Sequence, residues 1–144
     1  MAHFYTGYKS SVRKADEVLV AIELRLDPQI NVKLFKVSRR RDMDISTVTA
    51  AIAYRLQGQR VDRFAYAVGG VGPTVMRCKN AEAFLTGHTL TAATVEAAGN
   101  LAAEEVTPID DVRGSADYRR QLTKNLLCKW FYENEAMLAG GTSL

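Results

Sequence analysis

The stretch that decides the fold is Ile45-Ser46-Thr47-Val48-Thr49-Ala50-Ala51-Ile52-Ala53-Tyr54-Arg55-Leu56, an apolar and alanine-rich run in the first half of the chain. Its periodicity alone fits either a buried strand or a helix. Its threonines and valine favour a strand, because β-branched side chains fit a pleated sheet better than a helix. A turn at residues 57–60 ends the run.

Shorter runs on both sides of this stretch also have the composition of strands. Residues 32–37 alternate in polarity, which places Lys36 on the face opposite Phe35 and Val37. Three further strands are expected at residues 4–9, at residues 18–26, which stop at Asp27-Pro28, and at residues 64–68. The first half of the chain therefore predicts a sheet.

The second half of the chain predicts helices. A short helix is expected from Lys79 to Leu85, closed by Gly87, and a second from a cap at Thr91 to about Glu105. The longest helix begins near Ser115 and Asp117. Its apolar stripe comprises Tyr118, Leu122, Leu126 and Trp130, with Leu127 and Phe131 beside them. Strands followed by helices indicate an α+β fold: a mainly antiparallel sheet of about four strands, then about three helices packed on one face. We expect residues 1–144 to form a single domain.

Composition excludes several classes of protein. The 144 residues are 47% hydrophobic and 24% charged, with a net charge of +3, as in an ordinary globular domain. No apolar run is long enough to span a membrane, and the first residues lack the layout of a secretory signal, so we expect a cytoplasmic location. Cys78 and Cys128 lie far apart and form no Cys-x-x-Cys pair, which predicts buried free thiols.

Three other candidate sites have simpler explanations. The segment Gly69-Gly70-Val71-Gly72-Pro73 follows a strand but lacks the third glycine of a dinucleotide-binding loop, so we expect a tight turn. His3 and His88 have no metal-ligand spacing. The Asp42-x-Asp44 pair lacks the further oxygen ligands of a calcium loop, and a loop aspartate that caps its own backbone is expected instead. No catalytic residue and no metal site are predicted.

The basic run Arg39-Arg40-Arg41 leaves three interpretations open. Taken alone, it predicts a solvated loop. A nucleic-acid surface would require further basic residues interleaved with aromatics, and the charges elsewhere are mixed, so no nucleic-acid partner is expected. If anion binding did occur there, retention on heparin would depend strongly on salt. The third interpretation is a cofactor or anion site, which the neighbouring residues favour.

The neighbouring residues resemble a known family. The stretch Phe35-Lys36-Val37-Ser38-Arg39-Arg40-Arg41-Asp42-Met43-Asp44-Ile45 is similar to the strand–loop–strand of xanthine dehydrogenase flavin domains, with Phe-Lys, then Arg-Arg, then Asp-Ile. Four further motifs follow the same family in order: Phe4-Tyr5-Thr6-Gly7-Tyr8-Lys9, Asp16-Glu17-Val18-Leu19, Tyr66-Ala67-Val68-Gly69-Gly70-Val71, and Gly114-Ser115 with Asp117-Tyr118-Arg119. The resemblance covers residues 4–133. It implies the C-terminal subdomain of the flavin-binding module of a molybdenum hydroxylase.

The resemblance also implies a cofactor and a site. Lys36 matches the lysine that contacts FAD in the family, and a fixed cation there would stabilise the negative charge gained on flavin reduction. The loop beside the flavin would comprise Arg40, Arg41, Asp42, Met43 and Asp44. The Asp-Ile ending resembles the xanthine-type branch, which acts in purine catabolism. Mammalian members carry an aspartate at the position of Met43, so this chain lacks that carboxylate.

The resemblance implies that partners supply the remaining parts. Family members pass electrons from a molybdenum cofactor through iron–sulfur clusters to FAD, and then to NAD⁺ or oxygen. Two cysteines cannot supply the four thiolates of a [2Fe–2S] cluster, and no phosphate-binding glycine segments are visible. We therefore expect a fragment or split gene product that works with the N-terminal half of the FAD module and with iron–sulfur and molybdenum domains or subunits. The alternative is a stand-alone interaction module without redox activity. Substrate, oxidant and oligomeric state are not specified by the sequence.

Overall fold

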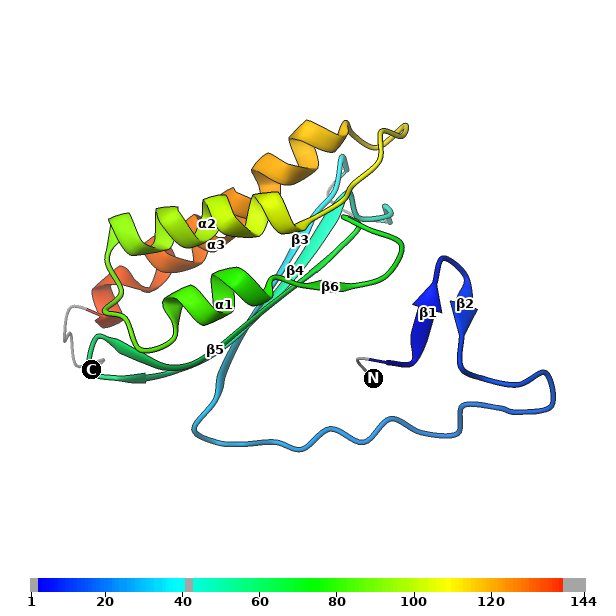
Figure 1. The fold of residues 1–144 in the computed structure, drawn as a ribbon, viewed down its shortest axis with the longest axis horizontal. Coiled ribbons are helices and arrows are strands. Elements are labelled where there is room, and N and C mark those ends of the chain that lie inside the picture. The colour runs from blue at the N-terminus through cyan, green and yellow to red at the C-terminus, as the bar shows by residue number, and fades with distance from the viewer. Residues whose placement is uncertain (1–2, 41–42, 139–144) are drawn as a thin grey trace.

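The protein is an α+β sandwich of one sheet and one layer of helices, with a separate N-terminal hairpin (Figure 1). The structure is a computed structural model and describes residues 3–40 and 43–138, with side chains up to residue 134. The main sheet has the order β3-β4-β5-β6, and every neighbouring pair is antiparallel. This confirms the predicted fold class.

The strands of the main sheet are consecutive in the chain. They are β3 (Asn31–Val37), β4 (Val48–Gln57), β5 (Arg60–Gly69) and the short β6 (Met76–Arg77). The two long strands β4 and β5 form a hairpin whose turn contains Gly58 at φ +59°, a backbone conformation that glycine adopts without steric cost. The alanine-rich run predicted as a strand therefore lies at the centre of the sheet.

Three helices cover one face of this sheet (Figure 1). They are α1 (Lys79–Leu85), α2 (Ala92–Glu105) and α3 (Ala116–Leu138). Thr91 caps α2 through a capping box with Thr94, which satisfies backbone N–H groups that the first helical turn leaves free. At the start of α3, the Ser115 hydroxyl oxygen accepts a hydrogen bond from the Tyr118 amide at 3.2 Å. All three helices begin within one residue of the predicted positions.

The core lies between the helices and what we call the covered face of the sheet. Trp130 on α3 is fully buried, and its ring lies 4.9 Å from that of Tyr54 and 5.4 Å from that of Phe64. The Tyr66 hydroxyl donates a 2.6 Å hydrogen bond to the Thr123 carbonyl oxygen, so a polar group at the centre of the core is satisfied. Large side chains from β4, β5 and α3 thus join the two layers.

A buried carboxylate fixes α1 to the sheet. The Glu82 carboxylate accepts a 2.8 Å hydrogen bond from the Tyr66 amide and pairs with the Arg77 guanidinium at 2.5 Å and 2.7 Å. Its side chain is almost fully buried, which is tolerated because both oxygens are bonded. Cys78 lies beside it as a buried free thiol, and burial raises its pKa to about 12. Cys128 is also free but only half-buried.

Two sequence-based expectations are wrong in detail. Residues 18–26 do not form a strand; every one of them is exposed, and they form no pairing with the described sheet. A strand requires β-forming residues and also a neighbouring strand to pair with. The sequence shows the β-forming residues but not the neighbour. On α3, Tyr118 of the predicted apolar stripe is 48% exposed, while Arg119 and Thr123 are buried in its place.

The N-terminal part contains a small hairpin of β1 (Tyr5–Gly7) and β2 (Ser10–Ser11). The hairpin lies on the side of the sheet that carries no helices, and the following segment runs back below the sheet to β3 (Figure 1). This segment and the uncovered face of the sheet thus lie on the same side of the domain.

Candidate functional site

Lys36 lies on the uncovered face of the sheet, which we call the open face. Strand register places Lys36 opposite Thr49, and Thr49 opposite Gly69, so the three form one row across β3, β4 and β5. Phe35, one position earlier, packs against the core on the covered face. The predicted orientation of Lys36 is therefore confirmed. Gly69 is needed in this row because an added Cβ would lie 2.5 Å from the Thr49 hydroxyl oxygen.

The remainder of the open face is built from small side chains. The next row joins Leu34, Ala51 and Ala67, and the row after it joins Val32, Ala53 and Ala65. The four alanines are half-buried, whereas Leu34 and Val32 on the edge strand are exposed. A face of alanines is flat and lets a second layer or a planar ring approach the backbone closely.

The charge of Lys36 is not compensated by any described residue. Lys36 forms no ion pair or hydrogen bond with residues 3–40 or 43–134. Lys33, on the same strand but on the covered face, bonds the Glu133 carboxylate at 3.0 Å. That contact lowers the pKa of Glu133. One strand thus carries a lysine that has a structural partner and a second lysine that remains available to an external group.

In the described part of the loop between β3 and β4, Arg40 and Asp44 contact each other. The Asp44 carboxylate accepts a 2.9 Å hydrogen bond from the Arg40 amide and lies 3.8 Å from the Arg40 guanidinium. These contacts, led by the Arg40 backbone hydrogen bond, lower the pKa of Asp44. The expectation that an aspartate caps its own loop is therefore confirmed for Asp44.

Of the other predicted loop residues, the structure describes Met43 but not Arg41 or Asp42. Met43 is 97% exposed and has φ +51°, so its side chain is in solvent. Arg39 donates a 3.0 Å hydrogen bond to the Val112 carbonyl oxygen, which ties the loop to the segment before α3. Arg41 and Asp42 lie outside the described residues. Among the described residues, no group of His, Cys, Asp or Glu side chains could hold a metal ion.

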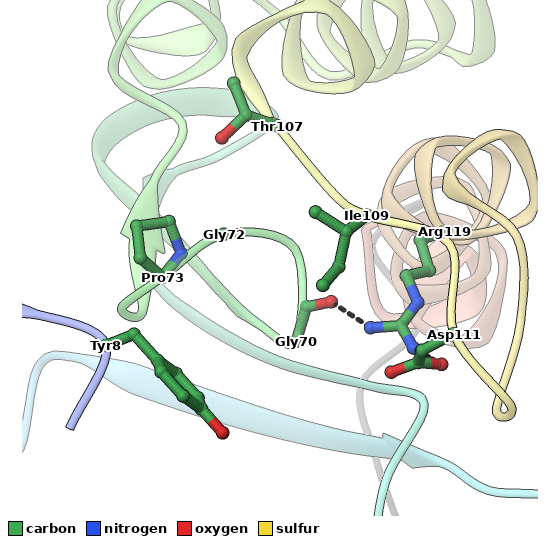
Figure 2. Close-up of a pocket in the computed structure, with 8 residues that line it drawn as sticks. All are labelled: Tyr8, Gly70, Gly72, Pro73, Thr107, Ile109, Asp111 and Arg119. Carbon is green, nitrogen blue, oxygen red and sulfur yellow. Dashed lines mark hydrogen bonds and ion pairs between the residues drawn. The ribbon is translucent and has the colours of Figure 1, made fainter.

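A cavity of about 340 Å³ lies beside the glycine turn that follows β5 (Figure 2). It is lined by Gly70, the residue after the one that ends the Lys36 row, and by Tyr8 of the N-terminal hairpin. Its other lining residues are Gly72, Pro73, Thr107, Ile109, Asp111 and Arg119. The predicted turn after β5 thus forms one wall of a cavity. Gly70 has φ +82°, and an added Cβ would lie 2.5 Å from the Thr47 carbonyl oxygen.

Arg119 is the basic residue among those that line this cavity, and sequence reasoning did not identify it as a site residue. Its guanidinium is almost fully buried and donates a 2.6 Å hydrogen bond to the Gly70 carbonyl oxygen and a 2.5 Å bond to the Asp111 carboxylate (Figure 2). Asp111 has a lowered pKa, caused first by a hydrogen bond from the Arg113 amide and then by Arg119. Arg119 thereby fixes the glycine turn to the start of α3.

Comparison with known proteins gives consistent results. The family model described as the CO dehydrogenase flavoprotein C-terminal domain matches residues 33–134. The xanthine dehydrogenase FAD-binding subunit of Escherichia coli O157:H7 is 32% identical over 143 residues, which are 98% of this chain and 48% of that protein. The carbon monoxide dehydrogenase medium chain of Hydrogenophaga pseudoflava is 27% identical over 124 residues, covering 86% of this chain and 43% of that protein.

The solved structures agree with these sequence comparisons. Quinoline 2-oxidoreductase from Pseudomonas putida 86 superposes with a TM-score of 0.82 at 29% identity, covering 91% of this chain and 45% of that chain. The protein thus spans about half the length of the curated relatives that it matches. No described helix is long and apolar enough to cross a membrane. Since the family model covers most of the sheet, α1, α2 and most of α3, the chain belongs to the CO dehydrogenase flavoprotein C-terminal domain family.

Proposed function

We propose that this chain is the FAD-contacting C-terminal domain of a xanthine-dehydrogenase-type molybdenum hydroxylase and is not catalytic alone. The observation that carries the proposal is the position of Lys36. Its ammonium has no partner among the described residues, and it stands on a flat face of small side chains at the loop end of the sheet. A cation beside a flat, apolar surface suits a planar ring that becomes negatively charged on reduction.

The residues present fit a contact with part of the cofactor but not a complete binding site. Lys36 would hold the flavin end, and Thr49 in the same row adds a hydroxyl group. When bound, FAD would supply electron transfer toward NAD⁺ or oxygen. Phosphate groups are commonly bound by glycine loops at helix N-termini, and the glycine turn at residues 69–73 leads into β6 and not into a helix. The phosphates would therefore be held by another part of the flavin module.

The β3–β4 loop would lie beside the flavin and affect its surroundings. Arg40 and Asp44 fix each other, so the net charge that this pair presents is small. Met43 adds an exposed, neutral side chain to the loop. Arg41 and Asp42 belong to the same proposed loop. The Asp44-Ile45 ending of the loop supports the xanthine-type branch over the carbon monoxide type.

The proposed partners are the other parts of a molybdenum hydroxylase. We propose that the N-terminal half of the FAD module packs against this domain, and that iron–sulfur and molybdenum domains or subunits deliver the electrons. Cys78 is buried, and the two cysteines lie on different elements, so they do not form an iron–sulfur site.

Substitution of Lys36 in the full-length flavoprotein subunit tests the proposal. We expect Lys36→Ala to weaken FAD binding about tenfold or more, because a charge-assisted contact contributes roughly 1.5–3 kcal/mol. The flavin midpoint potential should also become more negative, since the cation that favours the reduced form is lost. FAD content after dialysis and a spectroelectrochemical titration measure the two effects.

The matched control is Lys33→Ala, three residues away on the covered face. It removes a lysine from the same strand and should leave FAD content and potential unchanged, while Lys36→Arg should restore most of both. Equal FAD affinity and potential in Lys36→Ala and the parent subunit would remove Lys36 from the flavin site.

The isolated chain offers a second test. We expect purified chain to be colourless and to bind FAD weakly at best, because most of the binding contacts would lie in the other half of the module. Absorbance at the flavin bands after incubation with FAD and gel filtration gives the answer. Stoichiometric flavin on this chain alone would contradict the proposed division of the site.

A further inference from the structure

Met43, in the loop between β3 and β4, carries a thioether that lies in solvent. The chain has four methionines, and the structure describes the side chains of two of them, Met43 and Met76. Met43 is 97% exposed, whereas Met76 packs against the core and its sulfur lies 3.9 Å from the Thr107 hydroxyl oxygen. The two residues therefore form a matched pair, one open to solvent and one largely enclosed.

The fold makes no use of the Met43 side chain. Methionine usually fills gaps in apolar cores, but this side chain buries almost none of its surface. Its backbone has φ +51°, a conformation that residues with a side chain rarely adopt. The Asp44 carboxylate accepts a hydrogen bond from the Arg40 amide, and this contact joins the residues on either side of Met43. Packing therefore does not explain the exposed thioether.

Met43 is also the sulfur of the described residues that an oxidant in solvent reaches first. A thioether binds no proton at ordinary pH, so its lone pair needs no base to react with a peroxide. The two cysteines react as thiolates, and burial raises the pKa of both Cys78 and Cys128. Exposure thus favours Met43 over Met76, and protonation disfavours the cysteines.

We propose that Met43 is a modification site, oxidised to methionine sulfoxide by hydrogen peroxide, which leaves when oxygen takes two electrons and two protons at the neighbouring flavin. The inference rests on the proposed function, which places the β3–β4 loop beside the flavin and allows oxygen as the oxidant. The Met43 sulfur attacks one peroxide oxygen, and the O–O bond breaks. The hydroxide that leaves takes the proton of the new S–OH group and becomes water. Sulfur loses two electrons, and the peroxide gains them.

The product changes the polarity of the loop. A sulfoxide oxygen accepts hydrogen bonds far better than a thioether sulfur does. Arg40 of the same loop has a side chain that is 75% exposed, and a guanidinium offers several N–H donors. Because the Met43 side chain packs against nothing, its oxidation should alter the polar surroundings of the flavin without unfolding the domain.

Hydrogen peroxide added to the purified chain tests the exposure. Peptide mass spectrometry follows the gain of one oxygen atom at each methionine with time. We expect Met43 to be oxidised about tenfold or more faster than Met76, because folding encloses only the second sulfur. In concentrated urea the two rates should become similar. Equal rates in the folded chain would overturn the inference.

Repeated reoxidation of the full-length flavoprotein subunit tests the flavin as the source. The FAD-loaded subunit is reduced with light and EDTA in the absence of oxygen, and is then mixed with air in the dark with catalase present. Catalase destroys peroxide in the bulk solution, so only peroxide that reacts close to where it forms can modify the protein. We expect Met43 sulfoxide to increase with each cycle and Met76 to change little.

Two controls keep this experiment decisive. A subunit stripped of FAD and treated in the same way should gain no sulfoxide at Met43, and Met43→Leu should bind FAD and react with air as the parent does while it gains no oxygen at position 43. Oxidation of Met43 that catalase abolishes would overturn the inference, because the peroxide would then come from the bulk solution.

The FAD content of the subunit separates this inference from the proposed function. A full-length subunit that binds no FAD would contradict the proposed function. A subunit that holds FAD through Lys36 and is reoxidised by air, yet leaves Met43 unmodified after many cycles, would contradict the modification of Met43 alone.

Discussion

The two faces of the main sheet are built from the same strands but carry side chains of different size. On β4 and β5 the covered face presents Ile52, Tyr54, Phe64, Tyr66 and Val68, all buried under the helices. The open face presents Ala51, Ala53, Ala65 and Ala67 between them. The large side chains of the covered face pack against the helices, while the open face carries small, half-buried side chains and no helices.

The two lysines of β3 also differ between the faces, because only one of them has an ion-pair partner among the described residues. Lys33 on the covered face is paired with Glu133 of α3 and serves to hold the layers together. Lys36 on the open face has no partner among the described residues. The contacts that stabilise the domain lie on the covered face and the proposed flavin contact lies on the open face, so substitutions on the two faces should have separable effects.

The largest effect on stability is expected from the covered face. Trp130→Ala should lower the free energy of unfolding by about 3–5 kcal/mol, because it leaves a cavity between α3 and the rings of Tyr54 and Phe64. Leu34→Ala on the open face is the matched control and should cost about 0.5 kcal/mol or less, as its side chain is 70% exposed. Urea denaturation followed by circular dichroism measures both. Similar losses in the two variants would mean that the faces do not differ as described.

The end of the sheet that carries the candidate site should be nearly as sensitive. Gly70→Ala should destabilise by about 2–4 kcal/mol, because a side chain there is strained at φ +82° and also meets the Thr47 carbonyl oxygen. Gly58→Ala, in the β4–β5 turn, has a similar φ of +59° but open space around it, and should cost about 1–2 kcal/mol. Thermal or chemical denaturation measures both losses of unfolding free energy. Equal losses in the two variants would show that the close approach of Gly70 to the Thr47 carbonyl oxygen does not affect stability.

A smaller, pH-dependent effect is expected from Asp111. Its folded pKa is lowered, so its contribution is present above the unfolded pKa of about 4 and is lost as pH falls through the folded value. The parent protein should therefore lose thermal stability more steeply than Asp111→Asn below about pH 4. Melting temperatures recorded from pH 2 to pH 6 test this. Parallel curves across that range would show that the Arg113 and Arg119 contacts do not stabilise the ionised form.

Local signals were sufficient for most of the fold. The helix boundaries followed from Thr91, Ser115 and Gly87, since caps and breakers act through neighbouring residues. The strand β4 followed from β-branched residues within an apolar run. The orientation of Lys36 followed from alternation alone, because a pleated strand sends successive side chains to opposite faces.

The site could be predicted only in part. Lys36 and the β3–β4 loop were found by resemblance to a family, and they remain proposed flavin contacts. Arg119 was missed because its position in α3 suggests a surface residue, and only the folded chain brings the Gly70 carbonyl oxygen and Asp111 to it. Residues 18–26 were predicted as a strand from composition, but a strand also needs a neighbouring segment, which composition does not encode.

By itself, the sequence determined the order and length of the main elements and the alternation that separates the two faces, because these depend on interactions between residues close in the chain. Only the tertiary structure decided which face the helices cover, which charged groups are paired across the layers, and that residues 18–26 pair with no strand among the described residues. These depend on contacts between distant segments, whose geometry is fixed only when the layers pack together.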